Sequence, residues 1–283
     1  MFQVYNFKII KSGKEIEVYD YKTKNMLRGY KRKKQNKIKP RELVKKIQFE
    51  QDEIEQLDMY KYGKEVKAKN DEQTKKTESS MRRTRANIRR LTNSNPHLKK
   101  FLTLTFSEST TDLTKANRLF HLAMKRVFYT KPEFEYISVV EYQKDIDYFG
   151  RVKPEGGSVH YHLVCNIKTI LERTQFEWER WFQKRYWRYG FVKITDITSV
   201  NNIGAYLCKY LGKEMTDQRM FGRKKYFCSR GLKRPDELFG GEARMFYYKF
   251  LRELKPGFEK TYKGDWTGEV DYSAYTLNLP NNQ

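Results

Sequence analysis

Two histidines stand two positions apart in the segment Val159-His160-Tyr161-His162-Leu163-Val164. Because side chains alternate across a β-strand, His160 and His162 project from one face and Tyr161 from the other. Two imidazoles side by side on a rigid surface can bind a divalent metal ion. The alternative is a pair of histidines that only pack in the core or meet water at the surface.

Glu141 interrupts an apolar run, residues 137–140, in what we expect to be the neighbouring strand. A carboxylate in such a place is costly unless it is paired or binds a cation. Hairpin pairing would bring Glu141 beside the two histidines and give a His, His and carboxylate ligand set. Nitrogen and oxygen ligands together favour Mg²⁺ or Mn²⁺ acting on phosphate, with zinc as an alternative. The alternative for Glu141 is an ion pair with a lysine of the segment 206–213.

Tyrosines and lysines recur at helical spacing further along the chain. At about 100° per residue, one third of a helix carries Tyr206, Lys209, Tyr210 and Lys213. The adjoining apolar stripe consists of Val200, Ile203, Leu207 and Leu211. A phenol titrates near pH 10, so a tyrosine nucleophile needs a nearby cation and an activated phosphate. A lysine one turn away supplies the cation, and ordinary amphipathic packing is the alternative.

The elements that must hold these side chains follow from residue 101 onward. Alternating and β-branched segments predict strands over 101–106, 134–142, 158–167 and 191–197. Helical patterns predict one helix that begins at the N-cap Asp112 and others over 173–187 and 199–214. This order predicts an α+β fold, with a central antiparallel sheet and flanking helices. The segment after residue 215 shows no clear periodicity.

Residues 1–77 are expected to form a basic N-terminal extension, followed by a catalytic domain over 78–235 and a C-terminal extension of unknown role over 236–283. The first part contains a predicted hairpin over 2–19, a helix over 40–60 and a polar linker over 63–79, after which a second basic helix covers 79–91. Two basic clusters are candidate DNA contacts: Lys31, Arg32, Lys33 and Lys34, and Arg82, Arg83, Arg85, Arg89 and Arg90. A solvated surface face is the alternative for both.

The composition narrows the class of partner. The 283 residues include 58 Lys and Arg against 35 Asp and Glu, a formal net charge of +23, and 15% of the residues are aromatic. This combination favours a nucleic-acid partner. The aromatic content excludes full disorder, and the lack of any apolar run of about 18 residues excludes a membrane span. Without a signal peptide and with three scattered cysteines, a cytoplasmic protein with reduced thiols is expected.

Three motifs in a fixed order carry a resemblance to a known family. They are Phe101-Leu102-Thr103-Leu104-Thr105-Phe106, His160-Tyr161-His162-Leu163 and Tyr206-Leu207-Cys208-Lys209. Over about residues 78–235 the chain resembles the HUH-type rolling-circle replication initiators of plasmids and single-stranded DNA phages. The resemblance implies an HUH endonuclease fold, a derivative of the RRM/ferredoxin-like sheet. It also implies a metal-dependent activity that nicks and rejoins single-stranded or hairpin origin DNA.

Carried over to this sequence, the resemblance assigns a role to each candidate. His160 and His162 would be ligands of Mg²⁺ or Mn²⁺, with Glu141 as a third ligand. Tyr206 would be the nucleophile that forms a 5′-phosphotyrosine and leaves a free 3′-OH, with Lys209 as its helper. The second pattern, Tyr210-Leu211-Gly212-Lys213, resembles that of two-tyrosine members, so Tyr210 is either a second nucleophile or a packing residue.

No Walker A sequence occurs, so no nucleotide cofactor is expected. The expected partners are origin DNA and a helicase and DNA polymerase of a bacterial host. Two alternatives remain open at the level of the sequence. One is a relaxase or tyrosine transposase of the same superfamily, and the other is a non-catalytic basic nucleic-acid-binding protein.

Overall fold

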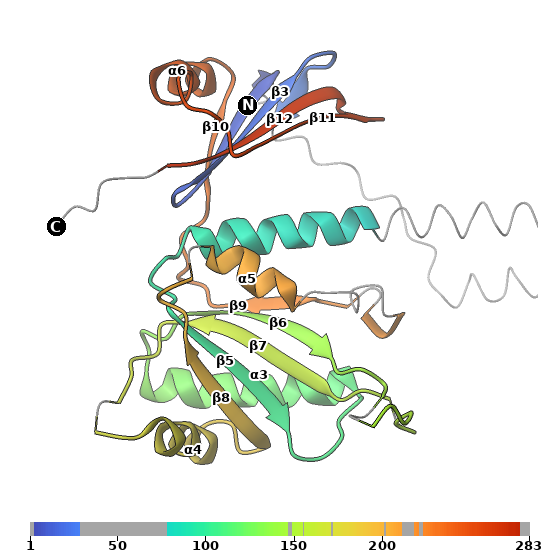
Figure 1. Ribbon diagram of the computed structural model, residues 1–283, viewed down its shortest axis with the longest axis vertical. Coiled ribbons are helices and arrows are strands. Elements are labelled where there is room, and N and C mark those ends of the chain that lie inside the picture. The colour runs from blue at the N-terminus through green and yellow to red at the C-terminus, as the bar shows by residue number, and fades with distance from the viewer. Residues whose placement is uncertain are drawn as a thin grey trace, which may run out of the picture.

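The computed structural model describes residues 3–28, 78–146, 149–154, 156–170, 172–200, 202–210, 218–220 and 223–277. These residues form two five-stranded antiparallel sheets, which lie one above the other in Figure 1 with helices between and around them. A two-stranded ribbon of β1 (Gln3–Tyr5) and β4 (Met26–Arg28) adjoins them. The fold is therefore α+β, as predicted.

The first sheet carries the histidines. Its strands lie in the order β8-β5-β7-β6-β9, and every pairing is antiparallel. Their bounds are β8 (Gly190–Asp196), β5 (Lys100–Phe106), β7 (Val159–Cys165), β6 (Tyr136–Tyr142) and β9 (Tyr226–Cys228). The histidine strand β7 is thus the central one, with two strands on each side of it.

One face of the first sheet is covered by α3 (Leu113–Thr130) and α4 (Gln175–Arg185), which lie below it in Figure 1. Helix α3 begins where predicted, because the Asp112 side chain accepts a hydrogen bond of 2.8 Å from the backbone N–H of Thr114. Phe120 of α3 stacks on Tyr161 of β7, with ring centroids 4.4 Å apart. The alternate residues of β7 that point this way, Tyr161 among them, form the larger core.

The other face is covered by a helix over residues 78–93 and by α5 (Ile203–Lys209), which lie between the two sheets in Figure 1. A second core joins Ile88 of the first helix, Leu207 of α5 and Val164 of β7. Val164 follows His162 by two positions, so the histidines face this layer. The strand therefore separates a purely structural face from the face that carries the candidate chemistry.

The second sheet joins segments from opposite parts of the sequence. Its order is β10 (Asp236–Phe239), β2 (Phe7–Ser12), β3 (Glu15–Tyr21), β12 (Gly268–Thr276) and β11 (Phe258–Gly264). Helix α6 (Gly240–Phe250) packs on it, and Ala243 of this helix shares a core with Ile9 and Val18. The hairpin near residue 13 and the segment after 235, which the sequence analysis treats as separate extensions, thus share one sheet.

Helix α5 is shorter than predicted. The sequence predicts a helix over 199–214, whereas the helix begins at Ile203, after the N-cap Asn202, and its last helical residue before the C-cap Tyr210 is Lys209. The preceding residues form a turn in which the N–H of Val200 donates to the carbonyl of Ile197 at 3.0 Å. An apolar stripe cannot distinguish a helical turn from such a tight turn, which explains the early predicted start.

Some predictions lie outside the described residues: the helix over 40–60, most of the linker over 63–79, and the cluster Lys31, Arg32, Lys33 and Lys34. The predicted basic helix over 79–91 is present and covers 78–93. Among the helices that the structure describes, none has the length and apolar composition needed to cross a lipid bilayer.

Candidate active site

The register of the first sheet brings the candidate metal ligands together. Glu141 on β6 lies directly opposite His160 on β7, as hairpin pairing predicts, and Thr103 on β5 lies opposite His162. The Glu141 carboxylate Oε2 is hydrogen-bonded to Nε2 of His162. The three predicted side chains are therefore neighbours on the face of the sheet that α5 covers.

His162 is held at both ring nitrogens. Its Nε2 meets Glu141, and its Nδ1 is 3.1 Å from the hydroxyl oxygen of Thr103. Only 6% of the His162 side chain is exposed, whereas the Glu141 side chain is about one quarter exposed. This places the imidazole in a fixed orientation at the edge of the solvent-accessible surface.

His160 has an unusual environment. Its Nε2 is buried and has no hydrogen-bond partner within the described residues. Burial, together with the neighbouring His162, lowers the pKa of His160 to about 4, so its imidazole is neutral at neutral pH and keeps a lone pair. A buried polar atom without a partner is costly, and a cation at this nitrogen would remove that cost.

We tested the arrangement for a metal ion on these features. The donors have the right chemistry, since two neutral imidazoles and a carboxylate suit a divalent cation, and His160 has a free buried nitrogen. In the part of the chain that the structure describes, however, no three His, Cys, Asp or Glu side chains converge as a ready-made metal cluster. Glu141 and His162 instead contact each other. The residues thus fit the predicted ion in donor type, and metal binding stays a prediction.

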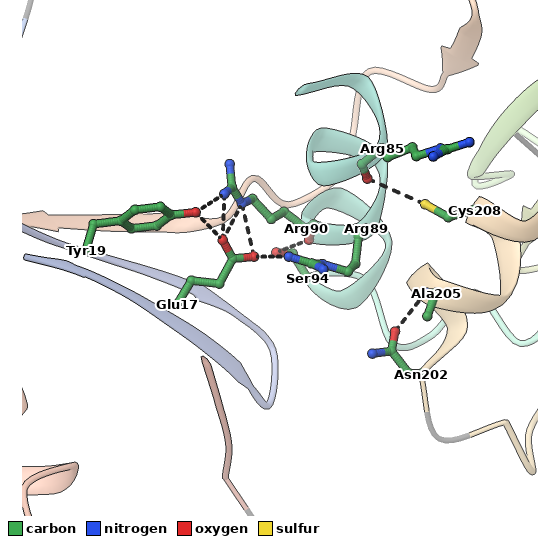
Figure 2. A network of polar contacts seen from close by, with 9 residues as sticks. All are labelled: Glu17, Tyr19, Arg85, Arg89, Arg90, Ser94, Asn202, Ala205 and Cys208. Atoms are coloured by element: carbon green, nitrogen blue, oxygen red, sulfur yellow. Dashed lines mark hydrogen bonds and ion pairs between the residues drawn. The ribbon is translucent and has the colours of Figure 1, made fainter. Parts of the chain in front are cut away.

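Helix α5 is fixed against the helix over 78–93. Its N-cap Asn202 accepts a hydrogen bond of 2.8 Å from the N–H of Ala205, and the Cys208 thiol donates to the carbonyl of Arg85 at 3.5 Å (Figure 2). Gly204 is buried at the crossing point, where its N–H donates to Oδ1 of Asn93 at 3.1 Å. A Cβ on Gly204 would lie 2.7 Å from the carbonyl oxygen of Arg89, so the close approach of the two backbones requires glycine.

Both tyrosines of α5 reach the histidine site. The ring of Tyr210 stacks on His162 with centroids 4.3 Å apart, and its hydroxyl donates to that of Tyr206 at 3.3 Å. The rings of Tyr206 and Tyr210 also contact Phe101 of β5, at 5.1 and 4.9 Å between centroids. The helix thus presents two phenols to one cluster that includes an imidazole.

The two phenols have different surroundings. Burial raises the pKa of Tyr210 to about 12, and its hydrogen bond to Tyr206 and the nearby Glu141 carboxylate act in the same direction. The Lys209 ammonium lies 5.6 Å from the ring centroid of Tyr206, which places a cation beside this tyrosine. Lys213, the second predicted lysine, lies outside the described residues.

The predicted arginine cluster divides into two groups. Arg82, Arg83 and Arg85 are exposed on the helix over 78–93. Arg89 and Arg90 instead turn to the second sheet and form ion pairs with Glu17 of β3, at 2.7 and 2.5 Å (Figure 2). The local sequence shows a run of arginines but not the buried carboxylate that two of them meet.

Phe101 and Thr103 are site residues that the sequence analysis did not single out. The motif over 101–106 was assigned as a strand, yet Phe101 and Thr103 alternate along β5 on the same face as the histidines. Phe101 packs against both tyrosines, and Thr103 contacts His162. The period of two in the sequence contained this signal, because residues 101 and 103 share a face just as residues 160 and 162 do.

The site lies within the segment that comparison with known families matches. Residues 99–215 match the model of the replication-associated protein ORF2 family. This segment runs from the start of β5 past α5 and contains the histidines, Glu141 and both tyrosines. Neither a curated protein nor a solved structure gives a significant match to the chain. The first sheet and α5 are therefore similar to a replication-associated protein family.

Proposed function

We propose that this protein initiates replication by nicking and rejoining single-stranded origin DNA, in the manner of HUH endonucleases. One observation carries the proposal: Tyr210 stacks on His162 and hydrogen-bonds Tyr206, so the tyrosines and the histidine strand form one site. The match of residues 99–215 to a replication-associated family supports the same biological role.

Tyr206 is the proposed nucleophile. Its hydroxyl oxygen accepts a hydrogen bond from Tyr210, and a donor to this oxygen favours the phenolate. The Lys209 ammonium beside the Tyr206 ring acts in the same direction. Attack forms a bond between the phenol oxygen and phosphorus and breaks the bond from phosphorus to the 3′ oxygen. The phenol proton passes to water, and the departing 3′ oxygen takes up a proton.

The product is a 5′-phosphotyrosine with a free 3′-OH that a host polymerase can extend after a host helicase opens the duplex. Rejoining reverses the same bond changes, so no nucleotide cofactor is required. In this proposal Tyr210 positions and polarises Tyr206 in the first cleavage. The bacterial cytoplasm is the compartment in which these partners are available.

His160, His162 and Glu141 are the proposed holders of Mg²⁺ or Mn²⁺. When bound, the cation supplies Lewis-acid stabilisation of charge on the scissile phosphate. Thr103 keeps the His162 ring oriented through Nδ1, as outer partners of metal-binding histidines do. The exposed Arg82 and Arg83, on the helix beside α5, are the proposed contacts to DNA phosphates.

The test is covalent capture. The purified protein is incubated with Mn²⁺ and a pool of random-sequence single strands labelled at the 3′ end, and labelled protein is detected on a denaturing gel. We expect an adduct that EDTA prevents and that Tyr206→Phe abolishes. Tyr129→Phe, at a side chain that is 90% exposed on α3, is the matched control and should leave the adduct unchanged.

Tyr210→Phe separates a helper from a nucleophile. It removes one hydrogen bond to Tyr206, so we expect the adduct to form about 3–10 times more slowly but still on Tyr206. An undiminished adduct in Tyr206→Phe would refute the assignment of Tyr206. An adduct that persists when both tyrosines are phenylalanine would refute the proposed function of the site.

A further inference from the structure

The outer face of α4 gathers positive charge far from the tyrosines. An open hollow of about 520 Å³ lies over this helix, and its lining includes Arg173, Arg180, Lys184, Arg185 and Arg188, the set that we term the α4 basic face. All five side chains are exposed. None of them forms an ion pair within the residues that the structure describes.

The only carboxylate in the lining is already engaged. Glu177 Oε2 accepts hydrogen bonds from the backbone N–H and the hydroxyl of Thr174, at 2.9 and 2.8 Å, in the capping box of α4. These bonds lower the pKa of Glu177, so it is ionised but committed to the helix end. The α4 basic face therefore keeps an uncompensated positive charge.

Helix stability does not explain this arrangement. Arg180 and Lys184 are four residues apart, and like charges at this spacing destabilise a helix. Lys184 and Arg185 suit the negative end of the helix dipole, whereas Arg173 precedes the N-cap Thr174 and faces the positive end. The charge of Arg173 and Arg180 thus lacks a structural reason, which points to a ligand.

The face is rigid and holds its guanidinium groups over aromatic rings. Trp178 and Phe182 anchor the opposite side of α4 in the core, with 3% and 0% of their surface exposed. The Arg180 guanidinium lies 5.5 Å from the ring centroid of Phe176, and that of Arg173 lies 5.9 Å from Trp181. Planar cations that aromatic rings hold in place suit the oxygens of phosphate groups.

The location separates this face from the candidate active site. Helix α4 packs on the face of the first sheet that carries Tyr161, whereas His160 and His162 lie on the other. A single strand that reaches Tyr206 does not cover α4 without passing around the edge strand β8. The α4 basic face is therefore a second contact surface.

We propose that the α4 basic face binds the phosphate backbone of duplex DNA next to the strand that the active site cuts. The choice of DNA among polyanions rests on the proposed function, since an initiator works where duplex and single strand meet. Such contacts are independent of base sequence, and they release counterions from the duplex, so the binding weakens steeply with salt.

The test measures binding of a fluorescent random-sequence DNA duplex by anisotropy, in EDTA, so that no cleavage contributes. The variant is Arg180→Gln, Lys184→Gln and Arg185→Gln together, which removes like-charge repulsion on an exposed helix and should not impair folding. The control is Lys255→Gln, Lys260→Gln and Lys263→Gln, which removes the same charge from exposed positions in and near β11.

We expect the α4 variant to lose about tenfold or more in affinity and the slope of log K against log [salt] to fall by about 2–3, since each phosphate contact contributes about 0.9. The control should change the slope by less than about 1. Equal losses in both variants would reduce the effect to bulk charge and overturn the proposal. So would undiminished duplex binding by the α4 variant, or a loss confined to vesicles that contain phosphatidylserine.

Single-strand capture at Tyr206 keeps the two proposals apart. The α4 variant should form the covalent adduct with single strands as the unaltered protein does. If no protein forms an adduct but the α4 variant alone loses duplex binding, the proposed nicking function fails and the α4 basic face stands.

Discussion

At the residue scale, His162 is the most constrained side chain of the candidate site. Thr103 and Glu141 occupy its two ring nitrogens, and the rings of Tyr210 and Phe101 stack against it with centroids 4.3 and 5.7 Å away. Its orientation is thus fixed before any ligand arrives. The neighbouring His160 is different, because its buried Nε2 meets no partner among the described residues.

We predict that Thr103→Val impairs metal use more than it impairs folding. Valine keeps the shape of threonine but removes the oxygen 3.1 Å from His162 Nδ1. Loss of such an outer partner raises the Mn²⁺ concentration for half-maximal adduct formation by about 10–100-fold. A Mn²⁺ titration of the capture assay measures this. Thr195→Val, at an exposed position of β8, is the matched control, and an equal shift in it would contradict the prediction.

At the element scale, the position of α5 decides where the phenols stand. This helix of seven residues has little intrinsic stability, so its neighbours hold it: Asn202 caps it, and Gly204 lets it approach the helix over 78–93. The two tyrosines lie on the side of α5 that meets Phe101. A small displacement of α5 therefore moves both phenols relative to the histidines.

We predict that Gly204→Ala lowers the free energy of unfolding by about 1–3 kcal/mol and slows adduct formation strongly. The added Cβ would lie 2.7 Å from the carbonyl oxygen of Arg89 and from Asn93 Oδ1, so the helices must separate. Gly241→Ala in α6 is the control, since its Cβ would meet nothing within 4 Å. Urea unfolding and the capture assay measure both effects. Unchanged stability and rate in Gly204→Ala would contradict the close-approach argument.

The elements of the first sheet were largely predictable from sequence. Alternation placed His160 and His162 on one face, and Asp112 marked the start of α3, because both signals lie within a few residues. The start of α5 was not predictable in this way. Its apolar stripe continues into the preceding turn at Val200, and only the cap at Asn202 ends the ambiguity.

At the scale of the whole molecule, a buried carboxylate joins the second sheet to the layer that holds α5. Glu17 of β3 has only 5% of its side chain exposed and bonds to Arg89, Arg90 and the hydroxyl of Tyr19 (Figure 2). The same helix over 78–93 receives the thiol of Cys208 on α5. The second sheet thus braces the helix against which the tyrosine helix packs.

We predict that Glu17→Gln lowers the free energy of unfolding by about 2 kcal/mol at neutral pH, because two arginines lose a buried counter-charge. Glu237→Gln is the control. Its side chain is 41% exposed and pairs with Lys8, so we expect a loss below about 1 kcal/mol. Urea unfolding measures both, and equal losses would contradict the importance of burial.

The same pair predicts a dependence on pH. Burial alone raises the pKa of Glu17, but its bonds to Arg90, Tyr19 and Arg89 prevail, and the pKa lies below the ordinary value of 4.5. The stabilisation is therefore complete above pH 4.5 and is lost as the pH falls through the native pKa. The difference in unfolding free energy between the unaltered protein and Glu17→Gln should shrink in acid. A difference that stays constant down to about pH 3 would contradict this.

The second sheet was beyond the reach of the sequence. Strand β2 pairs with β10 and β3 with β12, across more than 220 residues, and no local pattern reveals such pairings. For the same reason the run of arginines suggested DNA contacts at Arg89 and Arg90, while their partner Glu17 lies more than 70 residues away.

The pairing of β3 with β12 also sets an order of events during synthesis. About 250 residues separate the end of β3 from the start of β12. At about 5–20 residues per second, the early hairpin emerges from the ribosome some 12–50 s before its last partner. During that interval both outer edges of the hairpin are open to mispairing. The histidine strand is made within the same interval, so a nascent chain carries it before the brace on the helix over 78–93 is complete.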